Sequence, residues 1–136
     1  MSRAMFSILC LVLFAGCQLP PEQVPLKPLP EDGPLQAYAD LVNRARVQAS
    51  AANEAFYVNK WTDLEDAAKG LEQTATYLTK TADVPAKHRG SLAADTENLI
   101  KETRLLREAA KVQDVRQANE ILQRINLKVR ELRPEN

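Results

Sequence analysis

The sequence has little glycine, one histidine, and no excess of either charge. Four glycines in 136 residues are too few for a turn-rich, all-β chain. Eighteen basic residues balance eighteen acidic ones, so the chain lacks the overall positive charge on which binding to a nucleic-acid backbone depends. These shortages favour a helical domain and argue against nucleic acid as a partner.

The residues that usually carry catalysis or hold a cofactor are scarce or lack their motifs. The sequence contains no glycine-rich phosphate loop and no G-x-S-x-G nucleophile elbow. Pro85 stands three positions before His88, so the Glu-x-x-His motif of di-iron bundles is absent. We expect His88 to be exposed or half-packed, and acidic residues such as Glu120 to pair with a basic residue four positions later, here Arg124. We therefore predict a protein that is not an enzyme and that binds no metal and no cofactor.

The first residues have the pattern of a secretory signal peptide. Arg3 is the only charged side chain before residue 22, and it precedes an apolar run from Ala4 to Phe14. This run of about eleven residues is too short to span a bilayer, which needs about twenty. A charged start, a short apolar middle and small residues after it are typical of a signal peptide. We expect residues 1–16 to be removed together with Cys10, so that Cys17 is the remaining cysteine.

The residues Ala15, Gly16 and Cys17 resemble the lipobox of bacterial lipoprotein precursors, although Phe14 stands where leucine is usual. The resemblance implies cleavage between Gly16 and Cys17, and acylation of the Cys17 sulfur. It also implies a lipid-anchored protein of the cell envelope that faces the periplasm. Gln18, in place of an aspartate, favours the outer membrane over the inner one. The alternative is an ordinary cleavage site followed by a free or intermolecularly paired thiol.

Residues 17–34 have the composition of a proline-rich linker. Six of the eight prolines lie in this stretch, at positions 20, 21, 25, 28, 30 and 34. Proline fixes φ and restricts the residue before it, so we expect an extended, semi-rigid tether between the lipidated cysteine and the folded domain. At about 3.1 Å per residue, this tether reaches up to about 50 Å.

Residues 35–136 carry the periodicity of four amphipathic helices, at about 34–58, 62–81, 84–110 and 114–133. Apolar residues recur there at alternating steps of four and three, which places them on one face of each helix. The four predicted faces are Tyr38, Val42, Ala45, Ala49, Ala52 and Phe56; Leu64, Ala68, Leu71, Ala75, Leu78 and Ala82; Leu92, Thr96, Leu99, Thr103, Leu106 and Ala110; and Val115, Ala118, Leu122, Ile125, Val129 and Leu132. The predicted helix starts are Pro34, a capping box of Thr62 with Glu65, Asp83, and Asp114 with Gln117.

The short connections between these segments predict an all-α, antiparallel up-down four-helix bundle. The same periodicity also fits a helical hairpin that dimerises as a coiled coil, which is the alternative architecture. In the bundle, the 57–62 corner and the 111–114 loop lie at one end, opposite the end at which the tether enters. The small residues Ala45 and Ala52 leave two alternatives, a slender ligand pocket or close helix packing.

The last helix, ending at Val129–Arg133, resembles the last helix of cytochrome c-prime-type bundles. That family carries a C-x-x-C-H haem motif in the stretch where this chain reads Ile125–Val129. The resemblance implies a relative that lacks its haem. It leaves a ligand- or haem-binding electron carrier as the alternative function.

Three aromatic residues, Phe56, Tyr57 and Trp61, gather at the corner between the first two predicted helices. Aromatic side chains often anchor protein interfaces, so this corner is a candidate interaction site. The alternative is that the three rings cover the end of the core over Leu106 and Val115. Two leucines outside the predicted faces, at 105 and 127, are candidates for a dimer surface. We therefore expect a membrane-anchored lipoprotein whose non-catalytic bundle is a protein-interaction or structural module of the envelope.

Overall fold

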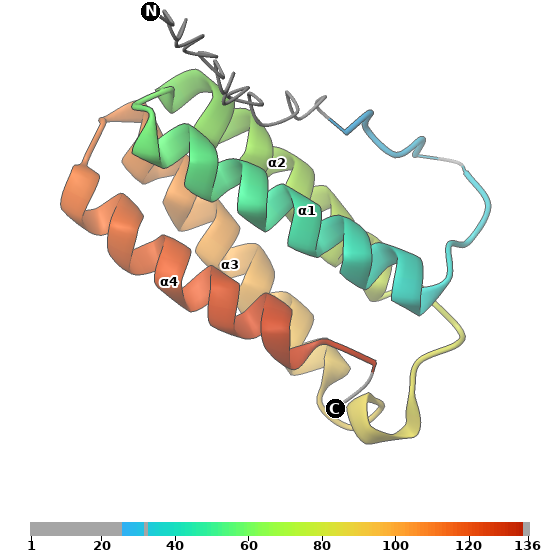
Figure 1. Ribbon diagram of the computed structural model, residues 1–136. Helices are drawn as coiled ribbons and strands as arrows, with labels where there is room; N and C mark the ends of the chain where they lie inside the picture. The colour runs from blue at the N-terminus through green and yellow to red at the C-terminus, as the bar shows by residue number, and fades with distance from the viewer. Residues whose placement is uncertain (1–25, 32, 135–136) are drawn as a thin grey trace, which may run out of the picture.

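The computed structural model describes residues 26–31 and 33–134, and this part of the chain contains helices without strands. The elements are α1 (Tyr38–Tyr57), α2 (Trp61–Leu78), the short 3₁₀ helix η1 (Ala86–His88), α3 (Leu92–Lys111) and α4 (Val115–Glu131). Figure 1 shows the four long helices side by side, each antiparallel to the next. The predicted antiparallel four-helix bundle is thereby confirmed. Because α1 packs against α4 as well as α2, one chain closes the core without the second copy that a dimerising hairpin needs.

The core lies inside this ring and is built from the predicted helical faces. Every residue of those faces is buried except Phe56, Ala82 and Val115. Ala82 lies beyond the end of α2, which stops at Leu78 rather than near Thr81. Phe56 and Val115 lie at the ends of α1 and α4, where the core meets solvent. Additional buried residues flank the predicted faces: Leu41, Ala55, Ala109 and Ile121.

The alanines of α1 let this helix lie close to its neighbours. Ala45 and Ala52 are fully buried, which favours close packing over a slender pocket at these positions. Two threonines of α3 are also fully buried, and their hydroxyls donate to the preceding turn. Thr96 lies 2.7 Å from the carbonyl oxygen of Leu92, and Thr103 lies 2.7 Å from that of Ile100. These bonds satisfy the two buried hydroxyls.

Gly70 makes room for a buried polar contact between α1 and α2. The Gln48 side chain crosses over Gly70 so closely that an added Cβ atom would lie 2.9 Å from Gln48 Nε2. The hydroxyl of Thr74 donates to Gln48 Oε1 at 2.7 Å. A glycine inside a helix costs about 1 kcal/mol relative to alanine. Here the absent side chain leaves the space in which Gln48 bonds to Thr74.

The turns that join α1 to α2 and α3 to α4 have the same backbone geometry. Asn59 and Gln113 occupy matching positions and have positive φ values of 57° and 55°. In the first turn, Lys60 N–H donates to Ala55 O at 2.8 Å, and in the second, Asp114 N–H donates to Ala109 O at 3.0 Å. These are the 6→1 hydrogen bonds of a Schellman helix ending. The fold therefore consists of two similar helical hairpins packed against each other.

The start of α1 differs from the prediction. The helix begins at Tyr38 and not at Pro34, because its first free N–H group finds a partner far away in sequence. Tyr38 N–H donates to Asp83 Oδ1 at 2.9 Å, and the Thr81 hydroxyl donates to the same oxygen at 2.6 Å. The Thr81 and Tyr38 hydrogen bonds lower the pKa of the Asp83 carboxyl group. Asp83 thus accepts a hydrogen bond from the start of α1 and does not cap α3, which begins at Leu92 after η1.

The predicted cap of α2 is wrong and that of α4 is confirmed. α2 begins at Trp61 after Lys60, and no side chain caps it, so Thr62 and Glu65 form no capping box. At α4, Asp114 Oδ1 accepts a 2.9 Å hydrogen bond from the backbone N–H of Gln117. Both helices follow the same kind of turn, so the turn fixes where α2 starts without a side-chain cap.

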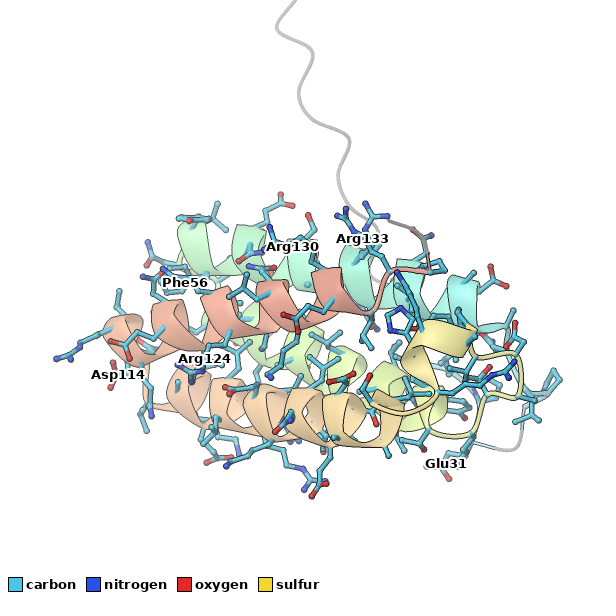
Figure 2. All side chains as sticks on the ribbon, turned by 90° about the horizontal axis from the view of Figure 1, so that it is seen from below. Glu31, Phe56, Asp114, Arg124, Arg130 and Arg133 are labelled. Carbon is cyan, nitrogen blue, oxygen red and sulfur yellow. The ribbon has the colours of Figure 1, made fainter. Side chains whose placement is uncertain are left out.

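Charged side chains link neighbouring helices on the outside of the bundle. Glu72 of α2 bonds to Arg104 at 2.7 Å and to Arg107 at 3.1 Å, both on α3. Arg124 of α4 pairs with Glu102 of α3 at 3.0 Å and lies on that side of α4 in Figure 2. The predicted pairing of Arg124 with Glu120 is therefore wrong, because the carboxylate on the facing helix takes its place.

The end of the bundle that holds both the start of α1 and the C-terminal residues is tied together by Tyr38 and His88. The buried Tyr38 hydroxyl donates to Leu132 O at 2.6 Å, and burial together with the nearby Asp95 charge raises the pKa of Tyr38 to about 12. The His88 ring stacks on the Tyr38 ring with centroids 5.7 Å apart, and its Nε2 lies 2.8 Å from Arg133 O. His88 is 7% exposed, so its expected exposure is wrong.

Part of the predicted tether packs on the bundle. Leu29 is buried, and its backbone forms two hydrogen bonds with the Gln73 side chain of α2. Leu29 N–H donates to Gln73 Oε1 at 3.1 Å, and Gln73 Nε2 donates to Leu29 O at 2.9 Å. The Tyr77 hydroxyl donates to the next carbonyl oxygen, that of Pro30. Residues 26–30, which we call the docked segment, therefore lie against the flank of the bundle (Figure 1).

Candidate functional site

The two hairpin turns lie together at one end of the bundle, which we call the distal end (Figure 1). This arrangement is the one predicted for the 57–62 corner and the 111–114 loop. In Figure 2, the labelled residues Phe56 and Asp114 lie at this end. The opposite end holds Tyr38, His88 and Leu132. The distal end is therefore formed by two segments that are far apart in the sequence.

The three aromatic residues of the predicted site have different surroundings at the distal end. Phe56 and Trp61 are partly buried and pack against the core, with ring centroids 6.0 Å apart in an edge-to-face arrangement. Tyr57 is 76% exposed, and its ring contacts the Phe56 ring at a centroid distance of 5.7 Å. Two of the rings thus cover the end of the core, and the third is presented to solvent.

Three valines add apolar surface to Tyr57. Val58 follows Tyr57 in the first turn, and Val112 and Val115 flank the second. Their exposed fractions are 55%, 74% and 56%. Val115 was expected in the core and is exposed instead, because it is the first residue of α4 and lies beyond the last layer of packing. Tyr57, Val58, Val112 and Val115 form what we call the distal patch.

Charged residues of both signs lie close to the distal patch along the chain. Lys60 and Asp63 approach to 3.8 Å at the start of α2, and Lys111 pairs with Glu108 at 2.8 Å at the end of α3. The hydrogen bond from Lys111, together with the Lys111 charge, lowers the pKa of the Glu108 carboxyl group. An apolar centre with a polar, charged rim is the usual composition of a protein interface.

The described residues contain no cluster that could hold a metal ion, and the histidine that could bind a haem iron is already engaged. Within residues 26–31 and 33–134, no three residues of the types histidine, cysteine, aspartate and glutamate could hold a metal ion. His88, the one histidine of the chain, already bonds to Arg133 O and stacks on Tyr38. Its Nε2 would have to leave Arg133 O to bind a haem iron.

The predicted lipidation and cleavage residues, Cys17 and Gly16, lie outside the described residues. Among the helices that the structure describes, none combines the length and the apolar character needed to cross a bilayer. Leu105 and Leu127 are exposed by 37% and 48%, as expected for residues outside the core faces. They lie on α3 and α4 and do not belong to the distal patch.

Sequence reasoning found Tyr57 and missed the valines of the distal patch. The available signal was a valine at the end of α1 and another at the end of α3, each just before a residue with positive φ. Large apolar residues in short turns have little core to enter, so they remain at the surface.

Comparisons of the chain with protein families, with curated proteins and with solved structures found no match.

Proposed function

We propose that this protein is a lipid-anchored protein of the bacterial cell envelope whose non-catalytic bundle binds a protein partner through the distal patch. The anchor is the acylated Cys17, and the domain faces the periplasm, with the outer membrane favoured by Gln18. The single observation that supports the interaction role is the distal patch, where Tyr57 and Val112 are each about three-quarters exposed.

The rigid backbone beneath these side chains favours a binding role. Both turns are fixed by backbone hydrogen bonds, so Tyr57 and Val112 have little backbone freedom to lose when a partner docks. Tyrosine is enriched among residues that dominate binding energy. The matching partner surface is apolar at its centre and polar at its edge.

The anchor is tested by mass spectrometry of the protein isolated from bacterial membranes. The expected product begins at Cys17 and carries the mass of a diacylglycerol group, with or without a further acyl chain. A product that retains Met1, or that has an unmodified Cys17, would refute the anchor and leave the interaction role to be judged separately.

The interaction role is tested by placing a photo-crosslinking amino acid at Val112 in intact cells, with Glu97 on the side of α3 as the control position. We expect a crosslinked product from position 112 and none from position 97. A crosslinker at Val115 should also give a product in the otherwise unchanged protein. The double variant Tyr57→Ser/Val112→Ser should lose this product. The matched variant Val47→Ser/Leu105→Ser, which changes exposed apolar residues outside the distal patch, should keep it.

The size of the product distinguishes a different protein from a second copy, which would add 15.2 kDa or less, because removal of residues 1–16 shortens the chain. Crosslinks that persist in the Tyr57→Ser/Val112→Ser variant, or that arise equally from position 97, would contradict a role for the distal patch.

A further inference from the structure

A groove between α1 and α4 carries positive charge that no described residue pairs with. It has a volume of about 580 Å³ and lies on the side of the bundle that α2 and α3 do not cover. Arg46 of α1 lines one wall, and Arg130 and Arg133 line the other. Figure 2 shows Arg130 and Arg133 on the side of α4 that borders α1. Within residues 26–31 and 33–134, no acidic side chain lines the groove.

These three arginines differ from three others that pair with a carboxylate on a neighbouring helix. Arg104 and Arg107 pair with Glu72 across α2 and α3, and Arg124 pairs with Glu102 across α3 and α4. Among the described residues, none of the arginines of the groove takes part in an ion pair. The groove therefore gathers three guanidinium groups whose charge the described part of the protein does not neutralise.

The dipole of α4 accounts for only part of this arrangement. Basic residues in the last turn of a helix are favoured by the partial negative charge at its C-terminus, which explains Arg130. Arg46 lies in the middle of α1, far from either helix end, so no helix dipole favours it there. Arg46 therefore adds to the groove a positive charge that no helix end favours.

A pair of side-chain amides that line the groove links α1 to α4. Asn53 of α1 and Asn126 of α4 exchange two hydrogen bonds, Nδ2 to Oδ1, at 3.0 and 3.1 Å. Asn53 Nδ2 also lies 2.9 Å from Ala49 O. This exchange holds α1 and α4 at a set distance, so the arginines are carried on two rigid elements and need no rearrangement to converge on a ligand.

The same groove has an apolar strip. Leu127 is 48% exposed and provides this strip beside the arginines, whereas Ala49 and Val129, which also line the groove, are buried. Guanidinium groups match the planar fork of a carboxylate or phosphate, and an adjacent apolar wall favours a hydrocarbon portion. We propose that the α1–α4 groove binds an amphiphilic anion, whose phosphate or carboxylate contacts the three arginines while its apolar part lies on Leu127. This proposal stands independently of the lipid anchor and of the distal patch.

The probe for this site is hexyl phosphate, titrated into the full-length protein in a neutral detergent and followed by native mass spectrometry. The variant Arg46→Gln/Arg130→Gln/Arg133→Gln should weaken binding by at least about tenfold, because each lost charged hydrogen bond alone can account for a factor of that order. The charge-matched variant Lys69→Gln/Lys87→Gln/Lys101→Gln should change binding by less than about twofold, because these lysines do not line the groove. Circular dichroism verifies that both variants keep the helical fold.

A further variant separates the groove from charge alone. Ser50→Phe fills the groove without changing any charge, and we expect it to weaken hexyl phosphate binding as well. Inorganic phosphate should bind at least about tenfold more weakly than hexyl phosphate, since it cannot use the Leu127 strip. Displacement of hexyl phosphate by phosphatidylglycerol, with phosphatidylcholine as the control lipid, would identify a membrane headgroup as the natural source. Failure of displacement would exclude phosphatidylglycerol as that source.

Three results would overturn the proposal. These are an equal loss of binding in the arginine and lysine variants, unchanged binding in the arginine variant, and equal binding of inorganic phosphate and hexyl phosphate.

Discussion

Tyr38 offers a direct test of how the end of the bundle opposite the distal patch is held together. Its side chain is 1% exposed, and its hydroxyl donates to Leu132 O at 2.6 Å. Tyr38→Phe removes the donor and leaves that carbonyl oxygen buried without this partner, which costs about 1–3 kcal/mol of unfolding free energy. For a domain of this size, each kcal/mol lowers Tm by about 4–8 °C.

The pH dependence of the same variant provides a second and more specific prediction. Burial, with a smaller effect of the Asp95 charge, raises the pKa of Tyr38 from 10.0 to about 12 in the folded protein. The unfolded chain therefore loses this proton first, so deprotonation favours unfolding. The stability that Tyr38 contributes is complete below pH 10 and falls as the pH rises towards 12, by about 2–3 kcal/mol over two pH units.

The assay is urea unfolding of the wild type and Tyr38→Phe, followed by far-ultraviolet circular dichroism at pH 8, 10, 11 and 11.5. The wild type should be the more stable protein at pH 8, and its advantage should shrink steadily above pH 10, because phenylalanine has no proton to lose. Other groups that titrate in this range affect both proteins alike. An advantage that stays constant from pH 8 to 11.5, or no difference at pH 8, would refute this reasoning.

Three further predictions concern local features of the fold, each measured as the change in unfolding free energy by urea denaturation. Gly90→Ala should stabilise the protein by about 0.4–1 kcal/mol, because nothing lies within 4 Å of an added Cβ atom, whereas Gly70→Ala should gain nothing or destabilise it, since the new methyl group meets a buried glutamine. A larger gain at Gly70 than at Gly90 would contradict this packing. Asp114→Ala should cost about 1 kcal/mol through the lost cap of α4, and Thr62→Ala should cost less than half of that, an order that a capping role for Thr62 would reverse. Gln73→Ala should speed amide hydrogen exchange at Leu29 by at least about fivefold while leaving α3 protected, and unchanged exchange would show that the docked segment is held by other contacts.

The fold was predictable from the sequence because four apolar faces repeat with helical spacing and the connections are short. The failed details share one physical cause. The start of α1 at Tyr38 depends on Asp83, which lies 45 positions away and whose local sequence fits equally well a cap for α3. Leu29 is buried against α2, where the Gln73 side chain offers both an acceptor and a donor to its backbone. Such contacts arise from tertiary packing, which periodicity does not encode.

The candidate site was predictable only in part. The cluster of aromatic residues identified Tyr57, but it also contained Phe56 and Trp61, which cover the end of the core. Val112 and Val115 belong to the other hairpin, so nothing in the local sequence links them to Tyr57. Their common surface follows from the antiparallel arrangement, which places both turns at one end.

The docked segment also sets how far the molecule can range from the bilayer, if Cys17 carries the proposed lipid. Since the chain is held against the bundle from Lys27 onward, where Arg44 of α1 donates to Lys27 O, ten residue steps separate Cys17 from this contact and span about 35 Å at most. That is about the length of α1 itself, at 1.5 Å per residue over 20 residues. A linker about as long as the bundle, joined to its flank, would keep any partner of the distal end within a thin layer next to the membrane.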